Sequence, residues 1–329
     1  VGIFAQGVVG LVLNNIRGCG FSRSLIELSG GTTRFEINYP YSEGANHGLV
    51  HGSSVMVGVV REPGSSQDGA RGAATGIPRP LLYFRHRSSD LRVEHPNLNH
   101  AYYGIRFVGG WFNSVVGGAV SDMFLPSAIK SVGDTSTIAC GTGFLSGATG
   151  ADAEIGWGNA VCGTLFVDCA HESSSDGVVL VRDQLSFGLD CSIQNRGQVG
   201  ASGRWSGGLL LHNCQGSSSL VSVQGQNYGL RTAGAQASMW FMALHVDGTA
   251  GSGAPAASAL EFGHTAQGPQ VDVLRMPSGG AIGFTVGFLS TPDLSLFIRQ
   301  ASLGSQVFSD CGLAWYQAAS PALDSAGVV

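Results

Sequence analysis

The sequence predicts an all-β protein built as a parallel β-helix of about 22 residues per coil. Three observations predict this fold class: a near-repeat at an almost constant offset, short apolar runs between turn residues, and 51 glycines in 329 residues. The glycines follow no G-X-Y period, so they indicate many tight turns and closely approaching backbones, and they exclude a collagen helix.

The near-repeat occupies the middle of the chain. Offsets of 22, 22 and 23 residues relate four units: CGTGFLSG (Cys140–Gly147), CGTLFVDC (Cys162–Cys169), QLSFGLDC (Gln184–Cys191) and GGLLLHNC (Gly207–Cys214). A repeat of this length is typical of a solenoid, whose coils stack about 4.8 Å apart. In this register Cys169, Cys191 and Cys214 superimpose, and we expect them to form a ladder inside the coil.

Strands are expected wherever a short β-branched run lies between turn residues. The clearest runs, in chain order, are GLVLNNI (Gly10–Ile16), GIRFV (Gly104–Val108), GVVLV (Gly177–Val181), SLVSV (Ser219–Val223) and AIGFTVGF (Ala281–Phe288). A helical solenoid would need amphipathic stretches of about ten residues or more, and Gly, Ser and Asn interrupt the chain too often for that.

The strand pattern divides the chain into four segments. They are residues 1–60 (N-terminal coils), 61–100 (a loop or insertion), 101–302 (the regular β-helix) and 303–329 (a cap or terminal element). The second segment is set apart because REPGSSQDGARGAATGIPRP (Arg61–Pro80) has no apolar pattern. A second loop is expected at DGTAGSGAPAASA (Asp247–Ala259).

Composition and charge exclude several functions. A net charge of −5 without a basic stripe argues against nucleic acid, and no apolar run reaches the length of a membrane span. There is no nucleotide-binding glycine motif and no Cys/His set with zinc spacing, so we expect no cofactor and no metal. No signal-like segment opens the chain. It starts at Val1 without a Met, so we expect a processed chain or a piece of a longer one.

Seven cysteines cannot form a complete disulfide framework. We expect the ladder thiols to be reduced and buried, because a buried thiol behaves as a small hydrophobe. Cys140 and Cys162 would begin a second ladder on another face. Disulfides between stacked neighbours are the alternative.

One unit carries a family resemblance. FVDCAHESSSDGVVLV (Phe166–Val181) resembles a recurring phrase of pectate-lyase-like β-helices and of bacteriophage tailspikes and tail fibres, and LLLHNCQGSSSLVSV (Leu209–Val223) is similar but lacks the glutamate. The resemblance implies a right-handed single-stranded parallel β-helix. It also implies a homotrimeric, extracellular spike of a phage virion, in contact with other tail proteins, that binds and often cleaves a host cell-surface polysaccharide.

Candidate catalytic residues come from the ladder. If the cysteines point inward, Asp168 and Asp190 point outward and stack about 5 Å apart, the separation that a retaining glycoside hydrolase needs. Glu172 would extend the acidic group. The alternative is that these carboxylates only satisfy backbone groups or face water. A lyase is disfavoured because Lys130 is the one lysine and no spaced acids suggest a calcium site.

Candidate carbohydrate-binding residues are aromatic, because sugar rings stack on exposed aromatic faces. They are Tyr102, Tyr103, Trp111, Trp157, Trp205 and Trp240. A further cluster, RHRSSDLRVEH (Arg85–His95), is interpreted either as a contact for an acidic glycan or as a solvated loop that pairs with its own Asp90 and Glu94.

Three functions therefore remain open from the sequence. The first is binding of a surface polysaccharide, the second is its hydrolysis by a glycan depolymerase, and the third is a purely structural role in a virion or surface fibre. Sparse acidic residues and the lack of a clear catalytic constellation favour binding or a structural role over hydrolysis, and an enzymatic activity is left undecided.

Overall fold

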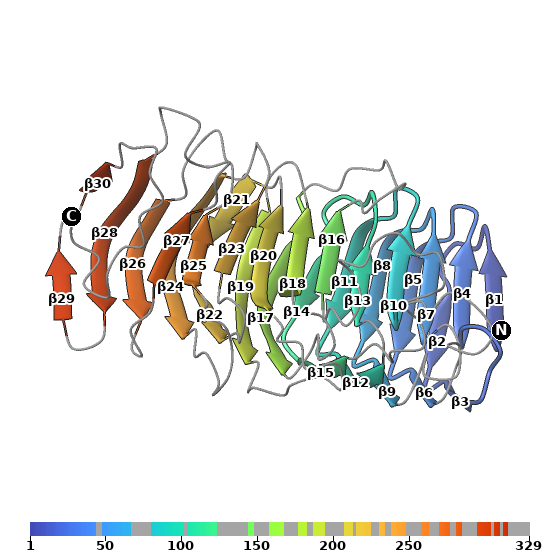
Figure 1. Ribbon diagram of the computed structural model, residues 1–329. Coiled ribbons are helices and arrows are strands. Elements are labelled where there is room, and N and C mark those ends of the chain that lie inside the picture. Colours follow the sequence, from blue (N-terminus) through green and yellow to red (C-terminus); the bar gives the residue numbers. More distant parts are fainter. Residues whose placement is uncertain are drawn as a thin grey trace.

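The computed structural model describes eighteen stretches of the chain. They are residues 1–43, 48–66, 80–101, 104–123, 144–147, 158–167, 177–182, 187–194, 207–212, 215–224, 230–233, 238–247, 258–262, 270–276, 281–284, 295–303, 306–309 and 312–314. Within them the chain forms thirty strands and no helix. Figure 1 shows the strands side by side in one long row, with β1 at one end and β28 to β30 at the other.

The first sheet has eleven strands, all parallel. They are β1 (Ile3–Gln6), β4 (Ile26–Ser29), β7 (Val50–Ser53), β10 (Leu82–Arg85), β13 (Ile105–Phe107), β16 (Phe144–Gly147), β18 (Gly177–Arg182), β20 (Gly207–His212), β23 (Leu230–Ala233), β25 (Ser258–Phe262) and β27 (Ala281–Phe284). Each strand pairs with the one two or three elements later in the chain, so the intervening elements belong to the other sheet.

The second sheet has nineteen strands. They are β2 (Val12–Asn14), β3 (Arg17–Cys19), β5 (Thr33–Asn38), β6 (Tyr41–Glu43), β8 (Met56–Arg61), β9 (Gly64–Ser66), β11 (Ser89–Glu94), β12 (Asn97–Ala101), β14 (Ser114–Val116), β15 (Ala119–Met123), β17 (Ala160–Val167), β19 (Phe187–Gln194), β21 (Gln215–Ser218), β22 (Val221–Gln224), β24 (Ser238–Asp247), β26 (Gln270–Met276), β28 (Ser295–Leu303), β29 (Gln306–Ser309) and β30 (Gly312–Ala314). Its strands are parallel except β29 and β30, which pair antiparallel with β28.

The all-β class and the parallel pairing of the predicted fold are confirmed. Each of the five apolar runs singled out in the sequence contains or overlaps a strand, namely β2, β13, β18, β22 and β27. Pairing changes from parallel to antiparallel at the C-terminal end, within the segment predicted to be a cap or terminal element.

Ladders of apolar side chains form the core between the sheets. In the main ladder of the first sheet, the buried side chains among those described are Ile26, Val50, Leu82, Ile105, Leu209 and Leu230. The second sheet has a matching ladder from Leu13 through Ile37, Val60 and Val93 to Val115. Burying one such side chain contributes about 1.5–3 kcal/mol, so the core is the main source of stability.

Single residues in the left-handed conformation make the bends between consecutive strands of the second sheet. Asn15, Tyr39, Glu62, His95 and Gly117 each follow a strand, and their φ values lie between 46° and 66°. Each amide donates to a carbonyl on the next rung, as from Tyr39 to Arg61 at 2.9 Å. In β17 this bend lies inside one long strand, because Gly163 (φ 66°) coincides with a register shift between Cys162 and Thr164.

A second corner is lined by buried polar side chains that bond to neighbouring rungs. The Oδ1 of Asn113 accepts the amide of Leu91 at 3.1 Å, and its Nδ2 donates to the carbonyl of Ser88 at 3.2 Å. The Oδ1 of Asn159 accepts the amide of Asn113 at 2.9 Å, one rung further on. These bonds satisfy backbone groups that the turn would otherwise leave buried and unpaired.

The predicted 22-residue register is wrong. CGTGFLSG contains β16 of the first sheet, whereas CGTLFVDC contributes to β17 of the second, so the two units are not successive rungs of one ladder. Phe144 pairs with Val179, and Val179 pairs with Leu209, so these rungs are 35 and 30 residues apart. The register fails because the repeat compares strands of similar composition that belong to different sheets.

Strands extend into both segments that the sequence predicts to be loops. Strands β10, β11 and most of β12 lie within 61–100, where the sequence predicts a loop or insertion, and they pair with strands of residues 1–60 and 101–123. Residues 67–79 of this segment lie outside the described residues. At the second predicted loop, β24 ends at Asp247 and β25 begins at Ser258, and the residues between them are also outside the described part.

Replacing Asn113 by alanine should destabilise the protein strongly. The change leaves the Leu91 amide buried without its partner, at a cost of about 1–3 kcal/mol, and removes one of two hydrogen bonds to the Ser88 carbonyl, which keeps the amide of Trp111 at 3.3 Å. Asn14→Ala is the matched control, because Asn14 is exposed and bonds only to the side chain of Asn38 among the described contacts, so we expect a loss below about 0.5 kcal/mol. Urea unfolding followed by circular dichroism measures both, and equal losses would contradict the structural role of Asn113.

Candidate functional site

Few of the residues predicted to bind carbohydrate fall in the described part of the chain. Trp240 of β24 is 44% exposed, and its indole N–H donates to Asp272 Oδ2 at 3.2 Å. Trp111 is half-buried beside β14. Tyr102, Tyr103, Trp157 and Trp205 lie outside the described residues. Trp240 therefore meets the expectation of an exposed aromatic, and the carbohydrate-binding role stays a prediction for all six residues.

Of the predicted catalytic residues, Asp190 is described, and its neighbours differ from those expected. Its partner on the preceding strand is Cys162, so the register that stacks it on Asp168 is not formed. Its Oδ1 accepts the amides of Ser219 at 2.6 Å and of Leu220 at 3.0 Å. This is the backbone-satisfying role that the sequence left open. Asp168 and Glu172 lie outside the described residues, so their catalytic role is untested.

A hollow of about 240 Å³ lies next to Asp190. Its described lining is mostly apolar and includes Leu165 and the exposed Leu220, with Asp190 as the one carboxylate. Thr164 also lines it, and its hydroxyl is buried without a partner among the described atoms. One carboxylate is half of what glycoside hydrolysis requires.

The described cysteines are free thiols in different surroundings. Cys191 is buried, as expected of an inward ladder position, but it pairs with Thr164 and Val221 rather than with Cys169. Cys162 and Cys19 are exposed. Full burial raises the pKa of Cys191, whereas at Cys162 the partial desolvation of an otherwise exposed residue raises the pKa. The nearby Asp190 carboxylate raises both pKa values further, and Arg92 lowers that of Cys162.

A second surface, which combines aromatic, charged and polar side chains, lies on the outer face of the first sheet, at its N-terminal end. Adjacent strands place Phe4, Glu27, His51, Tyr83 and Arg106 in one row, because these residues pair in register from β1 to β13. A groove of about 240 Å³ lies over the first four of them. Phe4 is 59% exposed at its edge. We call this surface the first-sheet groove.

The floor of the groove is held by His51. Its Nε2 lies 2.9 Å from the carbonyl of Pro80, and its Nδ1 lies 2.8 Å from the hydroxyl of Ser24. A carbonyl oxygen only accepts, so Nε2 carries a proton and donates to Pro80, while Nδ1 and the Ser24 hydroxyl share the second hydrogen bond. Both ring nitrogens are engaged and Ser24 is buried, so this pair positions the floor and is not an accessible nucleophile and base.

Aromatic and basic groups meet at Tyr83. Its ring packs edge-on against His51, with centroids 5.6 Å apart and planes at 87°. The guanidinium groups of Arg85 and Arg106 lie 5.7 and 5.4 Å from the centre of the Tyr83 ring, within the range of cation–π attraction. At the other side of the groove Arg23 bonds to Glu27 at 3.0 Å.

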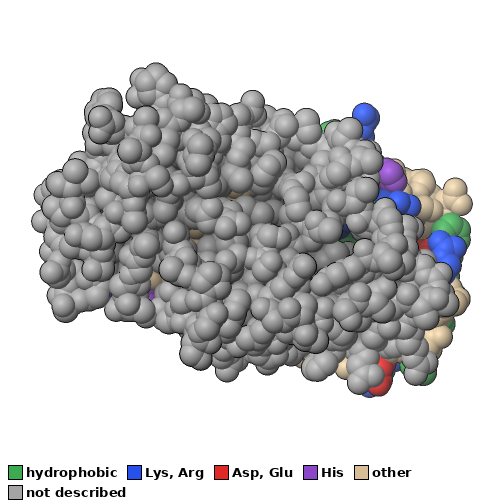
Figure 2. All heavy atoms as spheres, in the orientation of Figure 1, with side chains coloured by type: hydrophobic (Ala, Val, Ile, Leu, Met, Phe, Trp, Pro, Cys, Tyr) green, Lys and Arg blue, Asp and Glu red, His purple; other side chains and the backbone are tan. Residues whose placement is uncertain are grey.

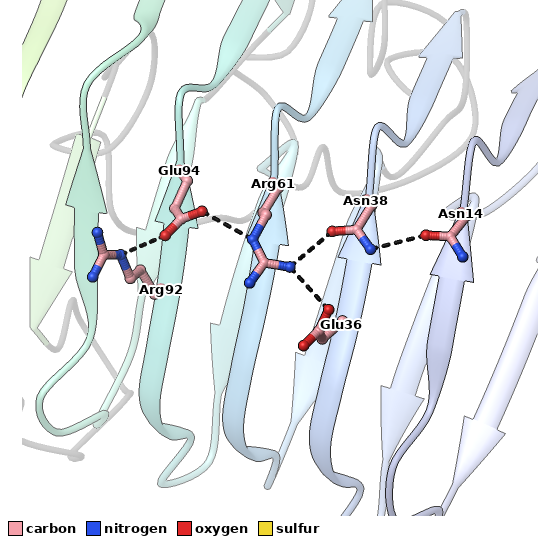
Figure 3. Close-up of polar contacts among 6 residues, drawn as sticks. All are labelled: Asn14, Glu36, Asn38, Arg61, Arg92 and Glu94. Atoms are coloured by element: carbon pink, nitrogen blue, oxygen red, sulfur yellow. Dashed lines mark hydrogen bonds and ion pairs between the residues drawn. The ribbon is translucent and has the colours of Figure 1, made fainter.

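The arginine-rich stretch Arg85–His95 is mostly strand rather than loop, and it takes part in two surfaces. Arg85 lines the first-sheet groove. On the second sheet Arg92 pairs with Glu94 at 2.7 Å, and Glu94 also pairs with Arg61 at 3.1 Å. Figure 3 shows the row that results, made of Asn14, Asn38, Glu36, Arg61, Glu94 and Arg92. The predicted pairing with Glu94 is confirmed, and this row is a structural feature in which opposite charges compensate.

The sequence did not point to the groove, because its residues are unevenly spaced. Phe4, Glu27, His51, Tyr83 and Arg106 are 23, 24, 32 and 23 residues apart, so no constant offset aligns them. The four strands IFAQ, IELS, VHGS and LYFR do carry a signal that could have indicated the outward row. In each of them an aromatic, charged or imidazole residue alternates with apolar neighbours.

Among the described residues, no group of three or more His, Cys, Asp or Glu side chains is placed to hold a metal ion. The same residues contain no helix long and apolar enough to cross a membrane.

Comparison of the chain with protein-family models, with curated proteins and with solved structures gave no match.

Thiol labelling tests the surroundings of Asp190. We expect iodoacetamide to modify Cys162 in the native protein and Cys191 only after unfolding, since Cys191 is buried and its pKa is raised. In Asp190→Asn the pKa of Cys162 should fall, so more thiolate is present and labelling at about pH 8 becomes faster. Peptide mapping by mass spectrometry resolves each cysteine. An unchanged Cys162 rate in Asp190→Asn would show that the carboxylate does not act on the thiol.

Proposed function

We propose that this chain is a right-handed parallel β-helix that binds a cell-surface polysaccharide through the first-sheet groove, as a homotrimeric spike or fibre protein of a phage-type virion. The observation that carries the binding proposal is the row from Phe4 to Arg106, which presents an exposed aromatic ring, charged groups and a hollow on one outward face. The trimer, the virion and the tail partners rest on the family resemblance.

The strand pairing supports a solenoid. Successive strands of each sheet are parallel, and the chain passes to the other sheet between them. Such a path buries apolar ladders inside and leaves alternate side chains pointing outward. An outward row then recurs on many coils, which suits an extended ligand such as a polysaccharide.

The chemistry of the groove suits a sugar chain. Sugar rings present apolar C–H faces that pack on aromatic rings, and their hydroxyl groups need donors and acceptors at the rim. Phe4 supplies an exposed ring, while Glu27, Ser29 and Ser53 supply polar groups beside it. The exposed Trp240 is a candidate for a second contact further along the row of strands.

Depolymerase activity is the second candidate, and the hollow beside Asp190 is the observation that favours it. Asp190 lies at an accessible surface with one carboxylate oxygen occupied by two amides, so the other oxygen is the atom available to substrate. A hydrolase also needs a second carboxylate, and Asp168 and Glu172 are the sequence candidates. A purely structural role would show neither binding nor cleavage.

Truncating Phe4 should weaken polysaccharide binding without affecting the fold. We expect Phe4→Ala to raise the Kd for a bound surface polysaccharide by about threefold to tenfold, the loss of one ring contact. Phe112→Ala is the matched control, because Phe112 is equally exposed at 54% and lies outside the groove. Affinity electrophoresis in gels that contain capsular polysaccharide or lipopolysaccharide measures both. Equal losses in the two variants would place the binding site elsewhere.

Reducing-end assays separate binding from cleavage. If the protein is a hydrolase that uses the predicted acids, new reducing ends should appear with the bound polysaccharide and disappear in Asp190→Asn or Asp168→Asn. Tight binding with no new reducing ends would exclude the hydrolase and leave the binding function. Cleavage that persists in both variants would show that other residues carry out the reaction.

A further inference from the structure

We infer that this chain associates with a second copy of itself through an exposed ridge on the second sheet, with the rows of strands of the two copies running in opposite directions. The ridge lies at the starts of β5, β8 and β11, and it consists of Arg34, Met56, Val57 and Asp90. We call it the corner ridge. The contact is twofold, so it is separate from the homotrimer proposed above and rests on these side chains rather than on the family resemblance.

Exposed apolar side chains form the centre of the corner ridge. Met56 and Val57 of β8 are both exposed, and so is Val9, which lies two rungs away in the row of Met56. Val57 has a φ of 52°, a left-handed conformation that Asn and Gly adopt readily and that a β-branched residue avoids. A valine here suits neither the backbone nor the core, so its side chain is assigned to a contact outside the chain. Figure 2 shows hydrophobic side chains exposed beside Lys or Arg side chains at the end of the molecule that carries β1.

Opposite charges lie on the two strands beside this centre. The residues that flank Arg34 on β5 pair with those that flank Val57, so Arg34 lies beside Val57. Asp90 of β11 lies beside Val57 on the other side for the same reason. Both charged side chains are exposed, their φ values are 53° and 55°, and neither forms an ion pair or a side-chain hydrogen bond among the described residues.

A twofold axis along the strand direction, between two copies that face each other at Val57, joins these charges. It reverses the order of the strands in the second copy, so Arg34 faces the partner's Asp90 and Asp90 faces the partner's Arg34. Between the two ion pairs, Met56 and Val57 meet their own counterparts. The result is an apolar centre with a charged rim, as in other protein interfaces.

Parallel copies would use charges that are already compensated. In that arrangement the ridge charges face Glu36 and Arg92, the next outward residues on the same strands. Glu36 already pairs with Arg61 at 2.9 Å, and Arg92 with Glu94 at 2.7 Å (Figure 3). The antiparallel arrangement instead joins the two ridge charges that lack a partner within the described part of the chain, so charge complementarity favours it.

Sedimentation equilibrium tests the association. The contact covers three strands about 4.8 Å apart, so it is small, and we expect a dimer Kd of about 1–100 µM. The mass should rise with concentration from the 33.9 kDa of one chain towards twice that value, and high salt should raise the Kd by screening the ion pairs. A mass that stays at one chain would overturn the inference. A trimer that does not associate further would also overturn it and agree with the proposed homotrimer, whereas six chains would be two trimers joined by this contact and would support it.

Charge exchange locates the contact. Arg34→Asp and Asp90→Arg each place like charges face to face, so each should raise the dimer Kd by about tenfold or more. The double variant exchanges the two charges, so its Kd should return to within about threefold of the original. Arg17→Asp is the matched control, because Arg17 is an exposed arginine on β3 outside the ridge. A double variant weaker than both single variants would show that the copies are parallel, and equal losses in the Arg17 variant would show an effect of overall charge; either result overturns the inference.

Val57→Asn separates the contact from folding. Asn adopts the left-handed conformation more readily, so the thermal midpoint of the variant should not fall. The loss of the apolar centre should nevertheless raise the dimer Kd by about tenfold. A variant that folds and dimerises like the original chain would place the contact elsewhere and overturn the inference.

Discussion

Parallel backbone pairing between strands that are far apart in the chain is the constraint on which the rest of this structure depends. In such a ladder, residues that pair on neighbouring strands lie directly beside one another. Where these residues face the core, apolar side chains must therefore recur from strand to strand. Buried apolar residues run from Ile26 through Val50 and Leu82 to Ile105 on successive strands of the first sheet. The chain between two strands is not under this constraint, so its length varies from rung to rung.

The corners allow this pairing to continue through sharp changes of direction. A bend exposes backbone groups that neither strand satisfies, and inside a protein an unpaired group costs more than a typical hydrogen bond contributes. At the corner that contains Tyr39, one residue in the left-handed conformation turns the chain. The amide of that residue still donates to a carbonyl of the neighbouring strand. At the other corner the side chains of Asn113 and Asn159 take the place of missing backbone partners. The corners thus keep the flanking faces regular, and the groove lies on one of those faces.

Sequence reasoning reached the class of the fold because strand formation is local. Short β-branched runs and glycine turns act within about ten residues, and the five runs identified from them all meet strands. Register is not local. The 22-residue offset matched Cys140–Gly147 with Cys162–Cys169 by composition, although β16 and β17 lie in different sheets. The groove was missed for the same reason. His51 and Tyr83 are neighbours on adjacent strands, but the segment between them differs in length from those of other rungs, so no constant offset aligns the two residues.

Stability and recognition are separated by the alternation of side chains along each strand. In β10 the inward Leu82 and Phe84 belong to the core, whereas Tyr83 and Arg85 face outward and belong to the groove. The buried ring of His51 lies beside Tyr83 in this outward row, where it bonds to Ser24 and Pro80 and packs edge-on against the Tyr83 ring. The guanidinium groups of Arg85 and Arg106 lie over the Tyr83 ring. Because inner and outer side chains alternate along each strand, the outer residues can change while the inner ladders that stabilise the fold stay the same.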